Sequence, residues 1–291
     1  MADANAAGAV GLRSAAELVD YVETVGVSKA AMPLQTTVVL GVMAGIFIGL
    51  GSMVYTMVTS DASMGFTARQ LLGGLAFCLG LVLVVIAGAE LLTGNILMLV
   101  AWANRRITFS QVARNWATVA LANLVGSVLL AVLVLYSGNL GLNKGLVATH
   151  ALEVAGHKDS LSFVTALVSG ILCNLLVCLA VWLSYAGRTV ADKILAVVFP
   201  ITTFVACGFE HSVADMYLLP LGLMLRASGV VAPGMASVTF GETVWHLLVV
   251  FVGNVIGGGV LVGLMYHWVY RVKTATQPGS VTSGLSEVAG K

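Results

Sequence analysis

The stretch "GFEHSVAD", Gly208 to Asp215, places two acidic residues and a histidine in the middle of an apolar segment, Ile194 to Leu225. A second stretch, "GAELLTGN", Gly88 to Asn95, lies in the middle of another apolar segment, Leu71 to Ala103. A straight helix over either segment would be about 48 Å long, whereas about 20 residues cross a bilayer. Each segment is too long for one crossing and too short for two with a turn. We therefore predict two crossings that are each built from two half-helices, because an irregular break is tolerated at membrane depth inside protein or beside a watery cavity.

The composition is that of a protein embedded in lipid. Hydrophobic residues make up 59% of the 291 residues and charged residues 9%, against roughly a quarter charged in a typical soluble domain. The net charge of +1 provides no strongly basic surface for nucleic acid. The four cysteines form no CxxC motif and no Cys/His spacing typical of metal sites, so we expect no cofactor. The chain is predicted to be an all-α integral membrane protein.

Six apolar segments predict six crossings, and the positive charges predict their orientation. Ten Lys and Arg residues fall on the side of both termini and four on the opposite side, which predicts that both termini are cytoplasmic. We expect a cytoplasmic N-terminal segment over 1–33 with an amphipathic helix, a six-span domain over 34–272, and a flexible cytoplasmic tail over 273–291. The amphipathic helix is expected at Ser14 to Ala30. The six segments run from Leu34 to Val58, Leu71 to Ala103, Trp116 to Tyr136, Leu161 to Gly187, Ile194 to Leu225 and Thr243 to Tyr270.

The two broken segments belong to an internal repeat. The third and sixth segments also repeat, as "NLVGSVLL" from Asn123 and "NVIGGGVL" from Asn254. Each repeat contains three spans, and an odd number makes the second copy enter the membrane from the opposite face. Inverted repeats with broken helices are typical of transport proteins whose site lies near the bilayer midplane. The matched positions in the breaks are Glu90 with Glu210, Leu91 with His211, and Asn95 with Asp215.

Ionisable side chains at the breaks are candidates for function, because an ionised group at the bilayer centre costs about 2.5 to 3.5 kcal/mol. For Glu90 and Glu210 we favour a structural role, in which each carboxylate accepts hydrogen bonds from backbone N–H groups that the break leaves unpaired. The position matching His211 is Leu91, so the symmetry of the repeat does not require a histidine there, and we predict that His211 handles a proton or an anion. Thr93 offers a hydroxyl in the corresponding break. Three residues near the breaks are by spacing alone ordinary packing residues: Phe77, Leu81 and Phe204.

The stretches "GFEHSVAD", "GAELLTGN" and "NVIGGGVL" resemble the signatures of the formate/nitrite transporter family. So do "SYAGRTVADK" and "LPLGLMLR" in the fourth and fifth segments. The resemblance extends over residues 15 to 272 and is nearest to the formate channels. It implies an aquaporin-like fold in a homopentamer with one pore per subunit, located in a bacterial inner membrane. It also implies passage of small monovalent anions of weak acids, without enzymatic activity.

The resemblance further implies roles for individual residues. His211 would be the central histidine, Thr93 the loop threonine, and Lys158 a vestibule lysine that attracts anions. Two departures leave the substrate open: the loop reads "TGN" where formate channels usually have a Thr-Ser-Thr style loop, and Asp215 stands where the family usually has Asn. Four residues would be structural or relay groups at the breaks: Glu90, Asn95, Glu210 and Asp215. Leu81, Leu91, Phe77 and Phe204 would line two constrictions, and Asn174 and Asn254 would be polar pore groups.

We therefore predict a formate channel whose flux is pH-dependent or proton-coupled through His211. The alternative is a nitrite or hydrosulfide channel of the same family, and lactate and acetate are further candidate anions. A membrane redox-enzyme subunit would need haem ligands, a metal cluster or a catalytic domain, and the loops are too short for such a domain. A purely structural scaffold would leave the two breaks with their buried acids unexplained. The choice between channel and proton symport, the protonation of His211 and Asp215, and gating by the N-terminal helix stay open.

Overall fold

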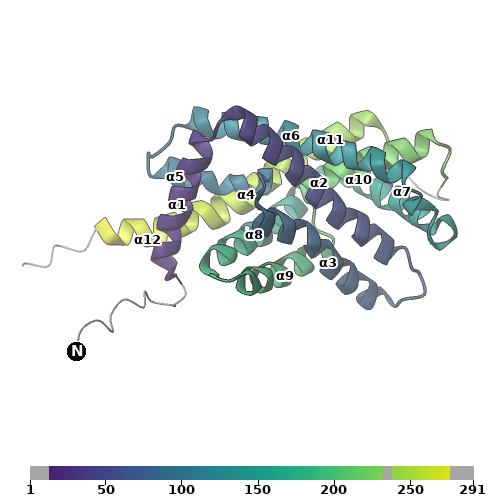
Figure 1. Cartoon of the computed structure of the whole chain (residues 1–291), viewed down its shortest axis with the longest axis horizontal. Coiled ribbons are helices and arrows are strands. Elements are labelled where there is room, and N and C mark those ends of the chain that lie inside the picture. Colours follow the sequence, from purple (N-terminus) through teal and green to yellow (C-terminus); the bar gives the residue numbers. More distant parts are fainter. Residues whose placement is uncertain (1–12, 232–237, 276–291) are drawn as a thin grey trace, which may run out of the picture.

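The computed structural model of the chain describes residues 13–231 and 238–275, and within these ranges the regular structure is helical (Figure 1). Five helices are long and apolar enough to cross a membrane, and one further crossing is formed by two shorter helices. This arrangement confirms the predicted all-α membrane fold with six crossings. The uninterrupted crossings are α2 (Leu34–Thr59), α6 (Phe109–Tyr136) and α8 (Phe163–Ala186).

The second crossing is interrupted where the sequence predicts a break. Helix α3 (Phe66–Leu83) ends in a π-helical turn, η1 (Val84–Gly88). After the break the chain resumes as α4 (Leu92–Asn95), the 3-10 turn η2 (Ile96–Met98) and α5 (Leu99–Ala103). The 33-residue apolar segment is therefore one crossing with an irregular centre.

The fifth crossing is broken in the same way between α9 (Val190–Ala206) and α10 (Ser212–Ala227). Gly208 in this break has a φ of 70°, and Gly88 in the other break has a φ of 81°. A Cβ atom added to either glycine would meet nothing within 4 Å. The left-handed backbone, rather than a lack of space, explains the glycine at both places.

The sixth crossing starts earlier than predicted, at Phe240 instead of Thr243. It consists of α11 (Phe240–Asn254), a π-helical stretch η5 (Val255–Leu264) and α12 (Met265–Ala275). The proposed division of the chain after residues 33 and 272 stays a prediction, and most of the tail lies outside the described residues.

Matching glycines bring the crossings of each repeat into close contact. A Cβ atom at Gly126 of α6 would fall on the carbonyl group of Val42 in α2, and one at Gly257 of η5 would fall on that of Ile171 in α8. Both glycines come three residues after the asparagine of the repeated motif. The same backbone contact therefore occurs once in each half, as an inverted repeat with small residues at its helix contacts requires.

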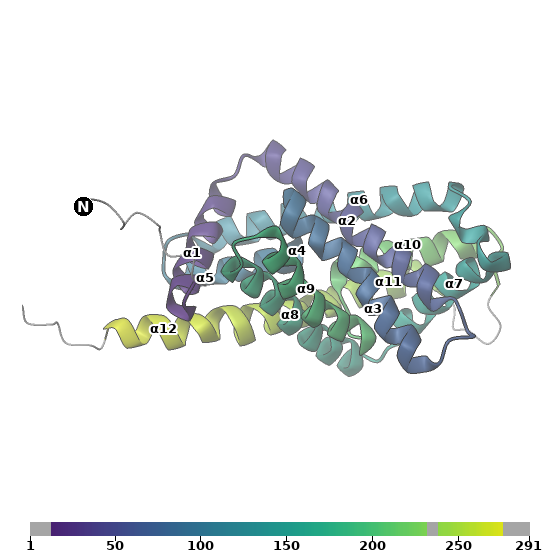
Figure 2. The ribbon, with the colours of Figure 1, turned by 60° about the horizontal axis from the view of Figure 1, so that its bottom comes forward.

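Two helices outside the crossings lie at opposite ends of the bundle, as Figures 1 and 2 show. Helix α1 (Ala15–Ala31) corresponds to the predicted amphipathic helix and packs on α5 and α12, whereas α7 (Leu146–Asp159) packs on α10. Each carries a lysine five residues before the next crossing, Lys29 and Lys158 respectively. The repeat thus includes the helix that precedes each first span, which the sequence-based prediction of three spans per repeat had missed.

Candidate functional site

Matching asparagines hold the half-helices that follow the two breaks. Asn123 Oδ1 on α6 accepts a hydrogen bond from the backbone N–H of Leu92 at 3.0 Å, and Asn254 Oδ1 on α11 accepts one from Ser212 at 3.0 Å. The amide nitrogens of these asparagines donate to the carbonyl group of the glutamate in the same break, at 2.9 and 3.1 Å. Each asparagine therefore satisfies both a donor and an acceptor that the break exposes.

The carboxylates of the two glutamates pair with lysines rather than with these N–H groups. Lys29 Nζ lies 2.5 Å from Glu90 Oε1, and Lys158 Nζ lies 2.7 Å from Glu210 Oε2. The expectation that the carboxylates hold the half-helices is thus corrected in favour of the asparagines. Both lysines reach in from α1 and α7, so each buried carboxylate gains a cation from a helix outside the crossings.

The α1 cluster consists of Lys29, Glu90, Asn95 and Asn115. Asn95 Nδ2 donates to Glu90 Oε2 at 2.7 Å and to Asn115 Oδ1 at 2.9 Å. The three residues other than the lysine are buried. The formal charges of this cluster cancel, since it contains one ammonium and one carboxylate.

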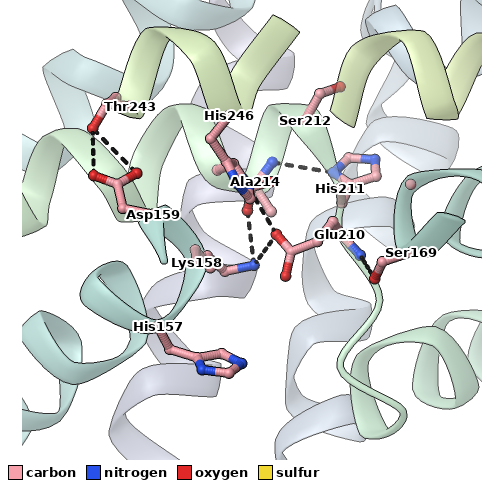
Figure 3. A network of polar contacts seen from close by, with 12 residues as sticks. His157, Lys158, Asp159, Ser169, Glu210, His211, Ser212, Ala214, Thr243 and His246 are labelled. Carbon is pink, nitrogen blue, oxygen red and sulfur yellow. Dashed lines mark hydrogen bonds and ion pairs between the residues drawn. The ribbon is translucent and has the colours of Figure 1, made fainter. Parts of the chain in front are cut away.

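The α7 cluster consists of Lys158, Glu210, Asp215 and His246. Figure 3 labels Lys158, Glu210 and His246. Lys158 Nζ lies 2.9 Å from Asp215 Oδ1 in addition to its contact with Glu210. His246 Nε2 lies 3.1 Å from Glu210 Oε2 and 3.5 Å from Asp215 Oδ2. Burial alone would lower the pKa of the Lys158 ammonium, but the carboxylates of Asp215 and Glu210 raise it above its ordinary value, so Lys158 is charged.

The two breaks meet at Thr93 and His211. Thr93 Oγ1 lies 2.9 Å from His211 Nε2, and both side chains are buried. The backbone N–H of Ala214 donates to His211 Nδ1 at 3.1 Å (Figure 3), so a neutral ring carries its proton on Nε2. The ring also stacks on Phe204, with 5.8 Å between ring centroids. His211 is therefore fixed with its Nε2–H directed toward the threonine of the other repeat.

Two cavities approach this contact from opposite ends of the molecule. The α7 cavity has a volume of ≈ 320 Å³, and Phe77, Phe204 and His211 belong to its wall. The α1 cavity has a volume of ≈ 380 Å³, and Leu91 and Asn95 belong to its wall. Each cavity is also lined by the lysine and the glutamate of its own cluster. The polar contact between the breaks therefore lies between two open spaces.

Leu81, Asn174 and Asn254, also named from the sequence, are not among the residues that line these two cavities. Leu81 is buried in the apolar core that also contains Leu91. Asn174 Nδ2 donates to the backbone carbonyl groups of Asn254 at 2.7 Å and of Thr93 at 3.3 Å. The pore roles predicted from the sequence, including those of the residues in the cavity walls and the attraction of anions by the vestibule lysine, all stay predictions.

Three members of the clusters were missed by sequence reasoning, although their spacing contains a signal. Lys29 and its counterpart in the second repeat precede the next crossing by the same number of residues. Asn115 and His246 each stand eight residues before the asparagine that holds the break. Comparing the two halves beyond their short motifs would have found all three.

A histidine on the rim of the α7 cavity has a perturbed titration. His150 Nε2 lies 2.9 Å from Thr59 Oγ1, and its Nδ1 lies 3.2 Å from Glu153 Oε2. Burial lowers the pKa of His150 below its ordinary value, and Glu153 offsets part of this effect. His150 is therefore a mainly neutral hydrogen-bonding group at neutral pH.

Residues 16–268 match the family model described as "Formate/nitrite transporter". The chain belongs to the formate/nitrite transporter family and is a multi-pass membrane protein. The resemblance drawn from the repeated motifs is confirmed by this match.

Relatives of known name are similar over nearly their whole length. Formate channel FocA of Escherichia coli (strain K12) is 41% identical over 266 residues, which cover 88% of this chain and 93% of that protein. Formate channel FocA of Haemophilus influenzae is 36% identical over 266 residues, covering 88% of this chain and 94% of that protein. A solved structure named "Pentameric formate channel with formate bound" is 36% identical, has a TM-score of 0.76, and covers 82% of this chain and 98% of that chain. This likeness supports the aquaporin-like fold of two inverted repeats.

Proposed function

We propose that the chain is a channel that passes formate and similar small anions of weak acids across a membrane. The relatives named as formate channels support this function, and so do the two cavities. The observation that carries the proposal is the 2.9 Å contact between Thr93 Oγ1 and His211 Nε2, one from each broken crossing. An anion that loses its water between the cavities would find the imidazole N–H and the threonine hydroxyl there as hydrogen-bond donors.

The fixed orientation of His211 favours oxyanions among the candidate permeants. One oxygen of formate can displace the Thr93 hydroxyl from Nε2–H, and the released hydroxyl can donate to the other oxygen. Formate and nitrite each provide two oxygens for this pair of donors, whereas hydrosulfide provides a single acceptor atom. We therefore place formate and nitrite ahead of hydrosulfide, with acetate and lactate limited by their size.

Proton coupling follows from the apolar walls beside this contact. Phe77, Phe204 and Leu91 solvate a bare anion poorly, so a permeant that takes up a proton crosses at lower cost. The proton comes from cavity water or from a doubly protonated His211, which would first give up its bond from the N–H of Ala214. Both routes make the flux rise in acid.

Stopped-flow uptake into proteoliposomes tests the proposed function. Formate, nitrite, hydrosulfide, acetate and lactate would be compared from about pH 5.5 to about pH 8. Formate and nitrite should be fastest, with rates that rise in acid. A formate signal no greater than that of empty liposomes, or a rate independent of pH, would refute the proposal.

Variants of the two donors separate permeation from folding. His211→Phe should reduce formate flux about 10- to 100-fold, the equivalent of one hydrogen bond to a charged group. His211→Gln retains a donor and an acceptor but does not titrate, so it should keep flux and lose the part of the pH dependence that His211 supplies. Thr93→Ser retains the hydroxyl and serves as the matched control for Thr93→Val.

We also propose that the protein is a homopentamer in a bacterial cytoplasmic membrane, with both termini in the cytoplasm. The excess of Lys and Arg on the side of the termini supports this orientation, and under it the α7 cavity opens to the outside. In a Cys207→Ser background, a cysteine at exposed Lys144 should react with an impermeant maleimide in intact cells, whereas one at exposed Arg105 should not.

Light scattering of the purified protein tests the pentamer, and a haem Soret band in its absorbance spectrum would favour the redox-enzyme alternative.

A further inference from the structure

The α1 and α7 clusters occupy equivalent places in the two repeats but differ at two positions. Asn95 and Asp215 each lie five residues after the glutamate of the break, and Asn115 and His246 each lie eight residues before the asparagine that holds it. In the α1 cluster a neutral pair of amides joins the two positions at 2.9 Å. In the α7 cluster an ionisable pair takes their place, with 3.5 Å between Asp215 Oδ2 and His246 Nε2.

A proton on His246 is needed to balance the charge of the α7 cluster. The Lys158 ammonium faces the two carboxylates of Glu210 and Asp215, which leaves one negative charge in excess. Asp215 is fully buried, and neither of its oxygens receives a hydrogen bond of regular geometry from the part of the chain that the structure describes. A buried carboxylate is costly unless a cation lies close to it. An imidazolium at His246 supplies that second cation.

The other groups near His246 do not supply a positive charge. Asp159 on α7 is acidic and accepts a hydrogen bond from Thr243, on the same helix as His246, at 3.1 Å. Glu242, four residues before His246, is acidic and exposed. Cys173 on α8 is a buried thiol. Among the described residues of this region, Lys158 is thus the one permanent cation, and the groups that face His246 are Lys158, Asp159, Glu210 and Asp215.

A metal ion is the other cation that this arrangement could suit, since Glu210, Asp215 and His246 each offer a ligand atom within 4.8 Å of the others. The Lys158 ammonium already lies 2.7 and 2.9 Å from the two carboxylates. It takes the place that a metal ion would need between them. The remaining imbalance is one unit of charge, which one proton corrects.

We propose that Asp215 and His246 form a proton-binding site that sets the charge which Lys158 presents to an anion in the α7 cavity. This inference rests on the proposed anion channel. Lys158 and Glu210 line the cavity, whereas the two other residues lie behind them and act as positioning residues through the lysine. With the proton bound, the cluster is neutral like its α1 counterpart. Without it, the cluster carries one negative charge beside the anion's path.

Anion uptake from the two ends therefore responds differently to pH. A unit charge about 8 Å from a monovalent anion changes the equilibrium occupancy of the cavity by that anion. The change is about twofold if the dielectric constant is that of water, and about thirtyfold if the effective dielectric constant is about 20. Uptake from the α7 end should fall by a factor in this range when that side is made alkaline, in addition to any pH dependence shared by both ends. The α1 cluster has neutral amides at the two positions, so its end should lack this step.

The double variant Asp215→Asn/His246→Asn tests the inference, because it gives the α7 cluster the side chains of the α1 cluster. Formate uptake into proteoliposomes of single orientation would be measured while the pH is changed on one side at a time. The wild type should show an additional alkaline loss of about twofold or more on the α7 side. In the double variant this additional alkaline loss on the α7 side should be absent. A pentameric, stable double variant that keeps the wild-type difference between sides would overturn the inference.

The reciprocal variant Asn95→Asp/Asn115→His is the matched control, and it should create a pH step on the α1 side. If the double variant of the α7 cluster does not fold, Asp215→Asn alone leaves one ammonium and one carboxylate and should lose the same step.

If the wild type does not transport formate, the proposed function fails while the proton site is still tested by thermal unfolding. The wild type should then lose stability as the pH rises above the range in which histidine is charged, and the double variant should not. Identical pH profiles of unfolding would overturn the inference.

Discussion

The α1 and α7 cavities share one framework but carry different chemistry at their mouths. Eight residues before the cluster lysine, α1 has Tyr21 and α7 has His150, and both side chains line their cavity. One residue before the lysine, α1 has Ser28 and α7 has His157. Together with Asp215 and His246 of the α7 cluster, these two histidines make the α7 end richer in acid–base groups. The shared parts support the broken backbone, whereas the parts that differ add acid–base groups in or beside the α7 cavity.

The largest expected effect in this comparison comes from removing the cluster lysines. Lys158→Met leaves Glu210 and Asp215 buried with only His246 to balance them among the described residues, and should lower the free energy of unfolding by about 3 to 5 kcal/mol. Lys29→Met leaves a single carboxylate that keeps its hydrogen bond from an amide, so we expect a loss of about 1 to 3 kcal/mol. Thermal unfolding of the purified protein measures both.

A second substitution controls for the size of the lysine side chain. Adding Asp215→Asn to Lys158→Met removes one of the two unbalanced carboxylates and should recover part of the lost stability. Equal losses for the two single lysine variants, without such recovery, would show that the extra acid of the α7 cluster does not matter for folding.

The framework asparagines should have equal effects at the two ends. Asn123→Ala and Asn254→Ala each leave a backbone N–H and a glutamate carbonyl group of a break without their partner. We expect each to lower the free energy of unfolding by about 1 to 3 kcal/mol. A difference well outside the error of thermal unfolding would mean that the two breaks are not supported in the same way, and would weaken the comparison between the repeats.

The fold could be predicted from the sequence because it depends on properties that can be read along the chain. The lengths of the two long apolar segments required breaks, and the matched motifs gave the inverted repeat. The central pair was also within reach, because Thr93 and His211 stand at the breaks that an inverted repeat brings together. The tautomer of His211 could not be predicted, because it depends on the 3.1 Å hydrogen bond from the backbone N–H of Ala214 to His211 Nδ1.

The clusters escaped prediction because their members are distant in sequence. Lys29 lies 61 residues from Glu90, and Lys158 lies 52 residues from Glu210. Both lysines belong to helices outside the crossings, so a search of the apolar segments alone finds carboxylates without cations. The partners follow once α1 and α7 are included in the repeat, and His246 then stands out because its counterpart is Asn115.

The smallest expected effect concerns the rim of the α7 cavity. Burial holds the pKa of His150 below its ordinary value, so below about pH 6.5 the unfolded chain binds a proton that the folded protein does not. Stability should therefore fall as the pH falls. His150→Gln should reduce this loss of stability in acid while changing the free energy of unfolding by about 0.5 kcal/mol at neutral pH.

Two further variants serve as controls. Because Glu153 raises the pKa of His150, Glu153→Gln should make the loss of stability in acid steeper. Tyr21→Phe at the matched α1 position removes a hydroxyl group and no histidine, so it should leave the profile of thermal unfolding between about pH 5 and pH 7 unchanged. An acid loss that persists in His150→Gln would assign it to another group and remove this difference between the two mouths.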